Sequence, residues 1–203
     1  MGDKIKRKRF YDGWRDYWGK LEQPLVNRVN FLLDSFDASE VFDSVSKISF
    51  GFGTIKKETN GTFAPVNEGY WLKDSNRVNT LYNYYRNNNV KALATIFPNG
   101  RNGKNYLGRG YVQVTHDYNA QKLQEALGIP FYENPDLLLD AGNAFKAMEY
   151  GVSTGLFTGK KLDDYFSGDE PDFFKSRKII NGMDCAGEIA EYCQQFYNII
   201  DFE

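Results

Sequence analysis

The sequence has few of the residues that build metal centres and disulfide frameworks. It contains one histidine, His116, and two cysteines, Cys185 and Cys193, among 203 residues. A zinc site takes about four nitrogen or sulfur ligands at characteristic spacings, which this set does not supply. The cysteines lie in an expected helix, where their separation in sequence places the Cα atoms about 12 Å apart, too far for a disulfide. We therefore expect no metal site and no bond between these cysteines.

Long apolar runs and an overall charge are also missing. No run approaches the roughly 20 residues that span a bilayer, and the basic start, Lys4–Arg9, leads into aromatic and charged residues rather than a signal peptide's apolar stretch. The 25 basic and 27 acidic residues nearly cancel, so the chain has no general attraction to nucleic acid or anionic membranes. We expect synthesis in the cytoplasm, without membrane insertion. Lys4–Arg9 is interpreted as a solvated helix end in preference to a polyanion-binding patch.

Apolar residues at helical spacing predict a mainly α-helical chain. Three such faces open the sequence: Phe10, Trp14, Tyr17, Trp18; then Leu25, Val29, Leu32, Leu33, Phe36; then Val41, Val45, Ile48, Phe52, Ile55. The third helix is expected to begin at 38–40, a capping-type sequence. Its Gly51 and Gly53 indicate close approach of another element, since glycine inside a helix is destabilising by about 1 kcal/mol. Later helices are expected at about 119–127, 171–180 and 185–200, with another after the Asn134–Asp140 segment.

Two carboxylates follow the third apolar face. Glu58 falls at the helix end, beside its buried stripe, and an Asn60-Gly61 turn then leads to Glu68 on an extended, polar segment. Glycosidic hydrolysis needs one carboxyl to donate a proton and another group to activate water. Burial favours the neutral form of a carboxyl, which suits Glu58 as acid and leaves Glu68 as base. Each glutamate taken alone is more readily explained as an ordinary structural residue.

The stretch from Tyr106 to Asn119, YLGRGYVQVTHDYN, is too polar for a plain core strand. Its two glycines flank Arg109, and residues 111–115 alternate with period two, which predicts a strand entering a helix. Asp117 and Asn119 are possible N-cap residues. His116, the lone histidine, is interpreted as structural.

These motifs carry a resemblance to a known family. The segments 57–59, 65–68, 106–119 and 134–137 resemble family-19 glycoside hydrolases, the chitinase-like branch of the lysozyme superfamily. Their order and spacing look closest to phage and prophage members that degrade peptidoglycan. Segments 155–162 and 177–182 also resemble the phage-type sequences, so the similarity covers most of the chain from about Phe10.

The resemblance implies roles for individual residues. Glu58 matches the general acid and Glu68 the base that activates water, while Thr115 matches the hydroxyl residue that helps hold that water. The cleft residues that contact sugar correspond to Tyr106, Gln113 and Asn119. Arg109 is expected to bind substrate, or to orient a carboxylate or the loop itself.

One departure from the family pattern affects the expected acid. The histidine that usually precedes this glutamate is Lys57 here, a permanent cation in place of a tunable imidazole. The two carboxylates remain, so we still expect activity.

The resemblance also implies a fold and a function. We expect one lysozyme-like domain over residues 1–203, mainly α, with two helical lobes around a cleft and a small β element. It would act as a monomer without cofactors, cleaving β-1,4 bonds of peptidoglycan with inversion, the carboxyl groups about 6.5–9.5 Å apart. As an endolysin it would reach the cell wall after release. A chitinase, a lytic transglycosylase and a catalytically inactive sugar-binding protein are the alternatives.

Overall fold

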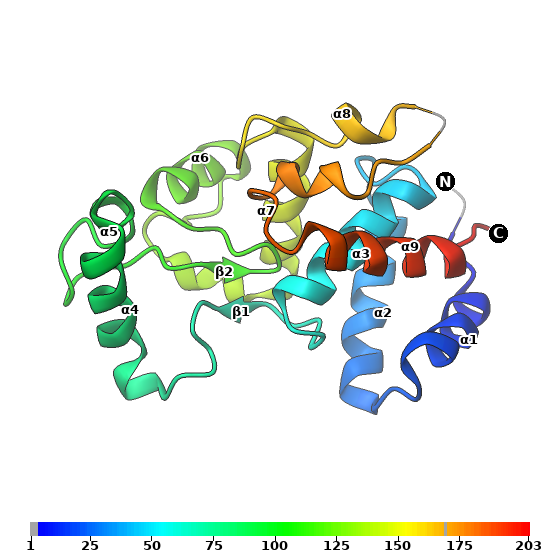
Figure 1. Cartoon of the computed structure of the whole chain (residues 1–203), viewed down its shortest axis with the longest axis horizontal. Coiled ribbons are helices and arrows are strands. Elements are labelled where there is room, and N and C mark those ends of the chain that lie inside the picture. Colours follow the sequence, from blue (N-terminus) through cyan, green and yellow to red (C-terminus); the bar gives the residue numbers. More distant parts are fainter. Residues whose placement is uncertain (1–3, 169) are drawn as a thin grey trace. The chain divides into compact units, whose positions relative to one another are not determined.

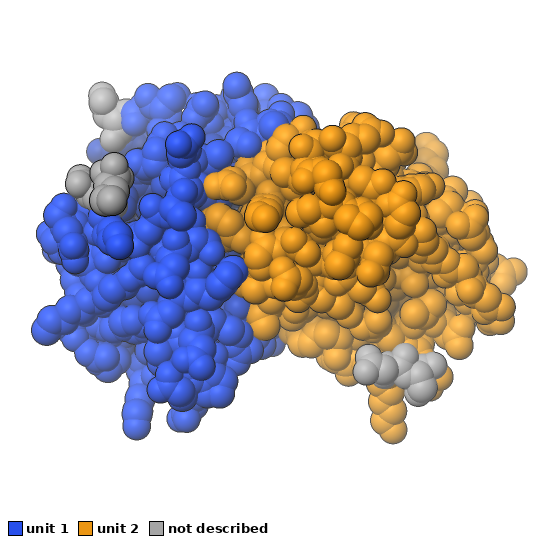
Figure 2. Space-filling model, turned by 180° about the vertical axis from the view of Figure 1, so that it is seen from behind, with its two compact units in different colours: residues 1–63, 151–203 blue, residues 64–150 orange. Residues whose placement is uncertain are grey.

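The computed structural model describes residues 4–168 and 170–203, which form two compact units (Figures 1 and 2). Unit 1 comprises residues up to Phe63 and from Gly151 onward, and unit 2 comprises Ala64–Tyr150. The described residues are mainly helical: α1 Arg7–Trp18, α2 Gln23–Asp37, α3 Val45–Glu58, α4 Asp74–Asn88, α5 Val90–Ile96, α6 Asp117–Leu127, α7 Ala141–Thr154, α8 Asp163–Phe166, α9 Ala186–Ile199, and the 3₁₀ helices η1 Pro135–Leu139 and η2 Lys175–Ile179. The mainly α prediction is confirmed, and the expectation of a single domain stays a prediction.

Helix α3 lies at the centre of unit 1, where α9 packs along it (Figure 1). Phe10 and Trp14 of α1 are buried with Phe52 of α3 and Phe196 of α9, and the Phe52 and Phe196 rings stack with centroids 5.0 Å apart. Phe10 and Trp14 of the aromatic stripe expected on the first helix are therefore core residues, whereas Tyr17 is exposed. This core fixes the position of α3 within unit 1, and with it the position of its last residue, Glu58.

Gly53 permits the close contact between α3 and α9. A Cβ atom at this position would lie 2.5 Å from Cys193 Sγ and 2.8 Å from the Cys193 backbone nitrogen. Gly51 faces Phe36 in the same way, with an added Cβ only 2.6 Å from the ring. The expectation of close approach at both glycines is confirmed.

The expected start of the third helix at 38–40 is wrong. The Ser39 hydroxyl accepts hydrogen bonds from the backbone N–H groups of Val41 and Phe42, at 3.1 and 3.0 Å, and so closes a turn. The helix begins at Val45, where the Ser44 hydroxyl accepts from the Lys47 N–H at 3.3 Å. Both serine hydroxyls accept from backbone N–H groups, but only Ser44 directly precedes a helix.

Unit 2 holds a two-stranded antiparallel sheet made by β1 Val66–Asn67 and β2 Arg109–Gly110. In its register, Val66 pairs with Gly110 and Asn67 pairs with Arg109. Helices α4 and α5 pack through a cluster that includes Leu81, Ile96, Phe97 and Leu107. Asn89 separates these helices and caps the second, because its side chain accepts from the Ala92 N–H at 3.1 Å.

The structure differs from three features that the sequence pattern predicted. Residues 111–115 form a turn, not a strand, because Gln113 has φ +53° and Val114 pairs back onto Arg109. The helix expected at 171–180 is confined to η2, Lys175–Ile179. The expected N-cap at Asp117 or Asn119 is also wrong: the residue before α6 is His116, with φ +75° and no side-chain cap.

The basic N-terminal run is neutralised by ion pairs within unit 1. Lys6 contacts Asp201 at 2.9 Å, and Arg7 contacts Asp34 and Asp37 at 2.7 and 2.6 Å. Ile5 also forms a β-bridge with Phe202 near the C-terminus. These pairs leave little free positive charge for a polyanion, in line with the interpretation as a helix end.

Over the described residues, no helix is both long and apolar enough to cross a membrane. The same part of the chain holds no group of three or more His, Cys, Asp or Glu side chains placed to bind a metal ion. Cys185 is exposed, Cys193 is buried, and both are free thiols.

Candidate active site

Glu58 is the last residue of α3 and is paired with a buried arginine. The Arg177 Nη1 donates to Glu58 Oε1 at 2.6 Å, and the two side chains are 7% and 17% exposed. The Arg177 Nε donates to the Asp184 carbonyl at 3.2 Å, which holds the guanidinium in place. If Glu58 acts as the expected acid, its proton would be on Oε2, because Oε1 accepts from Arg177. The environment of the Glu58 carboxyl is therefore set by the Arg177 cation as well as by burial.

Lys57, the departure from the family pattern, is paired with another residue. Its Nζ lies 2.6 Å from Glu188 Oε2 on α9, and the Tyr192 hydroxyl donates to Glu188 Oε1 at 2.9 Å. The Lys57 hydrogen bond, helped by that of Tyr192, lowers the pKa of Glu188. In turn, the same bond raises the pKa of Lys57. The Lys57 cation is thus paired with a carboxylate of α9.

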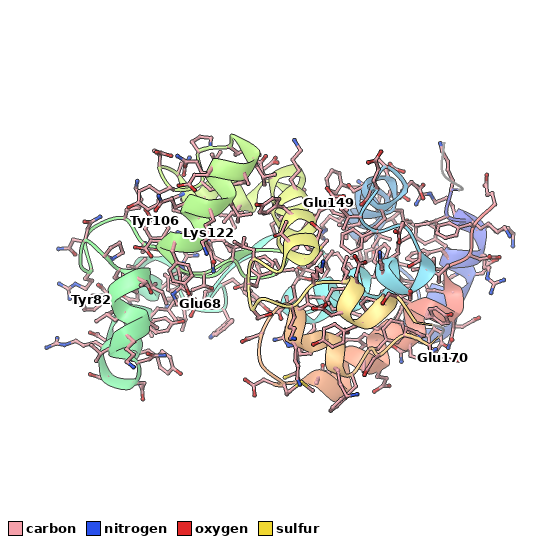
Figure 3. All side chains as sticks on the ribbon, turned by 90° about the horizontal axis from the view of Figure 1, so that it is seen from above. Glu68, Tyr82, Tyr106, Lys122, Glu149 and Glu170 are labelled. Carbon is pink, nitrogen blue, oxygen red and sulfur yellow. The ribbon has the colours of Figure 1, made fainter. Side chains whose placement is uncertain are left out.

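Glu68 follows β1 directly and is held at both carboxylate oxygens. The Tyr85 hydroxyl donates to Oε1 at 2.7 Å, and the Gly108 N–H donates to Oε2 at 3.0 Å. The Glu68 N–H donates to the Gly108 carbonyl at 2.7 Å, which extends the strand pairing by one residue. In Figure 3, Glu68 lies beside α4, the helix that carries Tyr82 and Tyr85. A carboxylate fixed by two donors has the defined orientation that a general base requires.

Thr115 lies beside the glycine that holds Glu68. A Cβ atom added to Gly108 would be 3.2 Å from Thr115 Oγ1 and 2.8 Å from Gln113 Oε1, so these groups crowd together. The Thr115 hydroxyl donates to the Gln113 carbonyl at 2.8 Å. Its hydrogen is therefore used, and its lone pairs can accept a hydrogen bond from a water.

The side-chain amide of Gln113 donates hydrogen bonds to the backbone. Its Nε2 donates to the carbonyls of Val66 and Gly110, at 3.1 and 3.2 Å, and so ties β1 to β2. A primary amide has two N–H donors, so contact with a sugar would fall to Oε1. The expected sugar contact stays a prediction, in which Gln113 Oε1 would accept a hydrogen bond from the sugar.

Arg109 is 5% exposed, and protein groups surround its guanidinium. Its Nε donates to Asp136 Oδ1 at 2.7 Å, and its other nitrogens donate to the Leu107 carbonyl at 2.8 Å and to Asn105. Of the roles expected for Arg109, this arrangement favours orienting the loop over binding substrate directly.

Tyr106 and Asn119 are both buried beside the same loop. The Tyr106 hydroxyl donates to the Tyr132 carbonyl at 2.9 Å, and the two rings stack with centroids 5.4 Å apart. Burial raises the pKa of Tyr106 to about 12. Asn119 donates to the Thr115 carbonyl at 2.9 Å, while its Oδ1 is buried without a hydrogen-bond partner among the described residues. A buried acceptor of this kind is expected to meet a water or a ligand donor.

His116 has a structural setting, as expected. Its ring stacks on Tyr118 with centroids 5.1 Å apart, and its Nδ1 lies 2.8 Å from Thr95 Oγ1. Thr95 donates its hydrogen to the Ala92 carbonyl at 3.1 Å, so the ring must donate from Nδ1. Burial lowers the pKa of His116, which keeps the imidazole neutral near pH 7.

Unit 2 therefore brings together five of the predicted site residues around one loop: Glu68, Tyr106, Arg109, Gln113 and Thr115, with Asn119 bonded to the last. Glu58 belongs to unit 1, and the separation of the two carboxylates stays a prediction. Sequence reasoning gave no role to Arg177 or Tyr85. The sequence holds no clear signal for Arg177, because Lys175, Ser176 and Lys178 surround it and its burial depends on tertiary structure.

Solved structures share this fold. The chain aligns with chitinase C from Streptomyces griseus HUT6037 at a TM-score of 0.58 and 19% identity, over 98% of this chain and 93% of the other. A second bacterial family 19 chitinase aligns at a TM-score of 0.52 and 17% identity, over 95% and 94% of the two chains. At these identities the likeness shows the fold, that of the chitinase-type helical proteins.

Sequence comparison connects the chain to plant proteins. Chitinase 1 of Oryza sativa subsp. japonica is 29% identical over 144 residues, which is 62% of this chain and 42% of the relative. Chitinase 3 of the same plant is 34% identical over 94 residues, or 39% of this chain and 29% of the relative. The chain thus spans less than half the length of these curated relatives.

The family model described as chitinase class I matches residues 34–155, more than half of the chain. The protein belongs to glycoside hydrolase family 19. The matched span includes Glu58, Glu68 and Thr115 but ends before Arg177.

Proposed function

We propose that this chain hydrolyses β-1,4-glycosidic bonds of a polysaccharide containing N-acetylglucosamine. The observation that carries the proposal is the setting of Glu68, whose carboxylate is fixed by Tyr85 and by the Gly108 N–H beside the Thr115 hydroxyl. An oriented carboxylate beside a hydroxyl suits a general base that binds and activates a water molecule. Family membership supports the same reaction.

The proposed reaction uses two carboxyl groups, those of Glu58 and Glu68. Glu58 donates a proton to the leaving glycosidic oxygen as its bond to the anomeric carbon breaks. A water held by Glu68 and Thr115 loses a proton to Glu68 and attacks that carbon from the opposite face. Donating one hydrogen to Thr115 and the other to Glu68 leaves the water's lone pair directed at the sugar. The products are a sugar of inverted configuration and a free hydroxyl on the leaving unit.

Chitin-type glycan is the first candidate substrate, because the named relatives and the solved structures of this fold are chitinases. Peptidoglycan is the second. It is favoured by the resemblance to phage-type sequences, which covers residues 57–59, 65–68, 106–119, 134–137, 155–162 and 177–182. An endolysin of this kind would act on the cell wall after release from the cytoplasm. The two substrates share the β-1,4 linkage and the N-acetyl groups, and differ in the peptide-bearing lactyl ether.

Substitution of the two carboxylates tests the proposal. We expect Glu58→Gln and Glu68→Gln each to reduce hydrolysis by about 10²- to 10⁴-fold, the usual contribution of a general acid or base. Glu125→Gln, an exposed change on α6, is the matched control and should leave the rate unchanged. The assay is release of reducing ends from chitin oligomers and, in parallel, from purified sacculi. Full activity in either site variant would refute its assigned role.

A further inference from the structure

The base Glu68 depends on a tyrosine outside the motifs that define the site. Tyr85 lies on α4, seventeen residues beyond Glu68, and its hydroxyl donates to Glu68 Oε1 at 2.7 Å. The ring is half-buried, and its edge-on contact with Tyr84 has centroids 5.4 Å apart. The second carboxylate oxygen is held by the Gly108 N–H at 3.0 Å. Two donors from different elements therefore fix both oxygens.

We propose that Tyr85 is a positioning residue for Glu68, whose hydroxyl fixes the carboxylate in the orientation that presents Oε2 toward Thr115. Gly108 bonds to Oε2 and abuts the Thr115 hydroxyl, so the water would meet the carboxylate on that side. Without Tyr85, one backbone N–H would hold a carboxylate that is free to rotate about its last bond. This inference rests on the proposed function, since it gives Glu68 the role of base.

Other charged groups also lie near Glu68. Arg109 on β2 is bonded to Asp136, Asn105 and the Leu107 carbonyl. His116, before α6, acts on Glu68 only through space. The Arg77 side chain of α4 passes 3.4 Å from a Cβ built on Gly69, the residue after Glu68. Burial, with the Glu68 bond second, raises the pKa of Tyr85, so the phenol remains a donor at any working pH.

Kinetics of Tyr85→Phe test the proposal, with Tyr84→Phe as the matched control, because that neighbouring ring is exposed. A hydrogen bond to a charged group contributes about 1.5–3 kcal/mol, so we expect kcat to fall about 10- to 100-fold with little change in KM. Wild-type kcat in a folded Tyr85→Phe protein would overturn the proposal.

A double-mutant cycle with Glu68→Gln separates positioning from a general structural effect. If Tyr85 acts through Glu68, the second substitution adds no further loss to Glu68→Gln. Equal losses in both backgrounds would contradict the proposal.

A readout without catalysis separates this inference from the proposed function. In NMR of protein with ¹³Cζ-labelled tyrosine, the Tyr85→Phe spectrum identifies the Tyr85 signal. We expect Glu68→Gln to lower the raised pKa of Tyr85, because the charge that opposes phenolate formation is removed. If that pKa does not move, the contact is absent and the inference fails. If it moves but no glycan is cleaved, the contact stands and the proposed function fails.

Discussion

At the scale of single residues, the Thr115 hydroxyl has the most specific role in the proposed site. Its hydroxyl hydrogen is given to the Gln113 carbonyl at 2.8 Å, so it faces a water as an acceptor. Its neighbour Gly108 leaves no space for a Cβ atom between Thr115 and Gln113. The loop therefore fixes both the position and the hydrogen-bonding role of this hydroxyl.

Replacing Thr115 with Val removes the acceptor and preserves the shape. We expect hydrolysis to fall about 10- to 100-fold, because the water loses one of its two anchors. Thr115→Ser, which keeps the hydroxyl, is the matched control and should retain most of the rate. Rates are measured on chitin oligomers for proteins of verified melting temperature. Equal activity in the Val and Ser variants would show that the hydroxyl does not hold the water.

At the scale of elements, the contact between α3 and α9 positions Glu58. Gly53 brings the two backbones together, and Lys57 pairs with Glu188 at the end of the same contact. Both features act on the helix that ends at Glu58.

Gly53→Ala tests the close approach of these helices. An added Cβ would meet the Cys193 backbone nitrogen at 2.8 Å, so the helices must separate, and we expect a loss of about 1–3 kcal/mol in the free energy of unfolding. Gly187→Ala on α9 has no atom within 4 Å of its added Cβ and should be neutral or stabilising, because alanine favours helix. Urea denaturation measures both variants. A Gly53→Ala protein as stable as wild type would contradict the packing described.

The Lys57–Glu188 pair predicts a dependence of stability on pH. The folded state lowers the pKa of Glu188 below its ordinary 4.5. The contribution of the pair is therefore complete above about pH 4.5 and is lost as the pH falls through the lower, folded value. We expect Glu188→Gln to lower the melting temperature at pH 7, by an amount that shrinks toward pH 3. Glu191→Gln on the same helix is the control. A difference that grows on acidification would contradict this assignment.

At the scale of the whole molecule, backbone pairing joins the two ends of the described chain. The Lys6 N–H donates to the Asp201 carbonyl at 2.9 Å, and the Glu203 N–H donates to the Lys4 carbonyl at 2.9 Å. Ile5, 1% exposed, lies between these bonds. The basic run thus belongs to the structure of unit 1.

Removal of residues 201–203 tests this terminal contact. We expect a lower melting temperature, because Ile5 loses its strand partner and Lys6 its carboxylate. Asp201→Asn keeps the backbone pairing and should produce a smaller decrease. An unchanged melting temperature after truncation would show that the contact contributes nothing.

The sequence predicted features whose cause is local or periodic. Helical spacing identified the buried faces of α1 and α2, and Asn60-Gly61 marked the turn after α3, where both residues have positive φ. The turn at Gln113 was missed because alternation alone cannot show a positive φ at a residue whose amide bonds to the carbonyls of Val66 and Gly110. Arg177 and Glu58 are 119 positions apart, so their pairing depends on tertiary structure, which no local pattern contains.

Mass analysis of glycan digests tests the central claim most directly. Chitin oligomers and purified sacculi are incubated with wild-type protein and with Glu68→Gln. The account predicts that each β-1,4 bond cleaved in the wild-type digest adds one water across its two new ends and leaves a free reducing end, and that far fewer such products form with Glu68→Gln. Anhydro-sugar ends, or no cleavage of either glycan by wild-type protein, would contradict a two-carboxylate hydrolase.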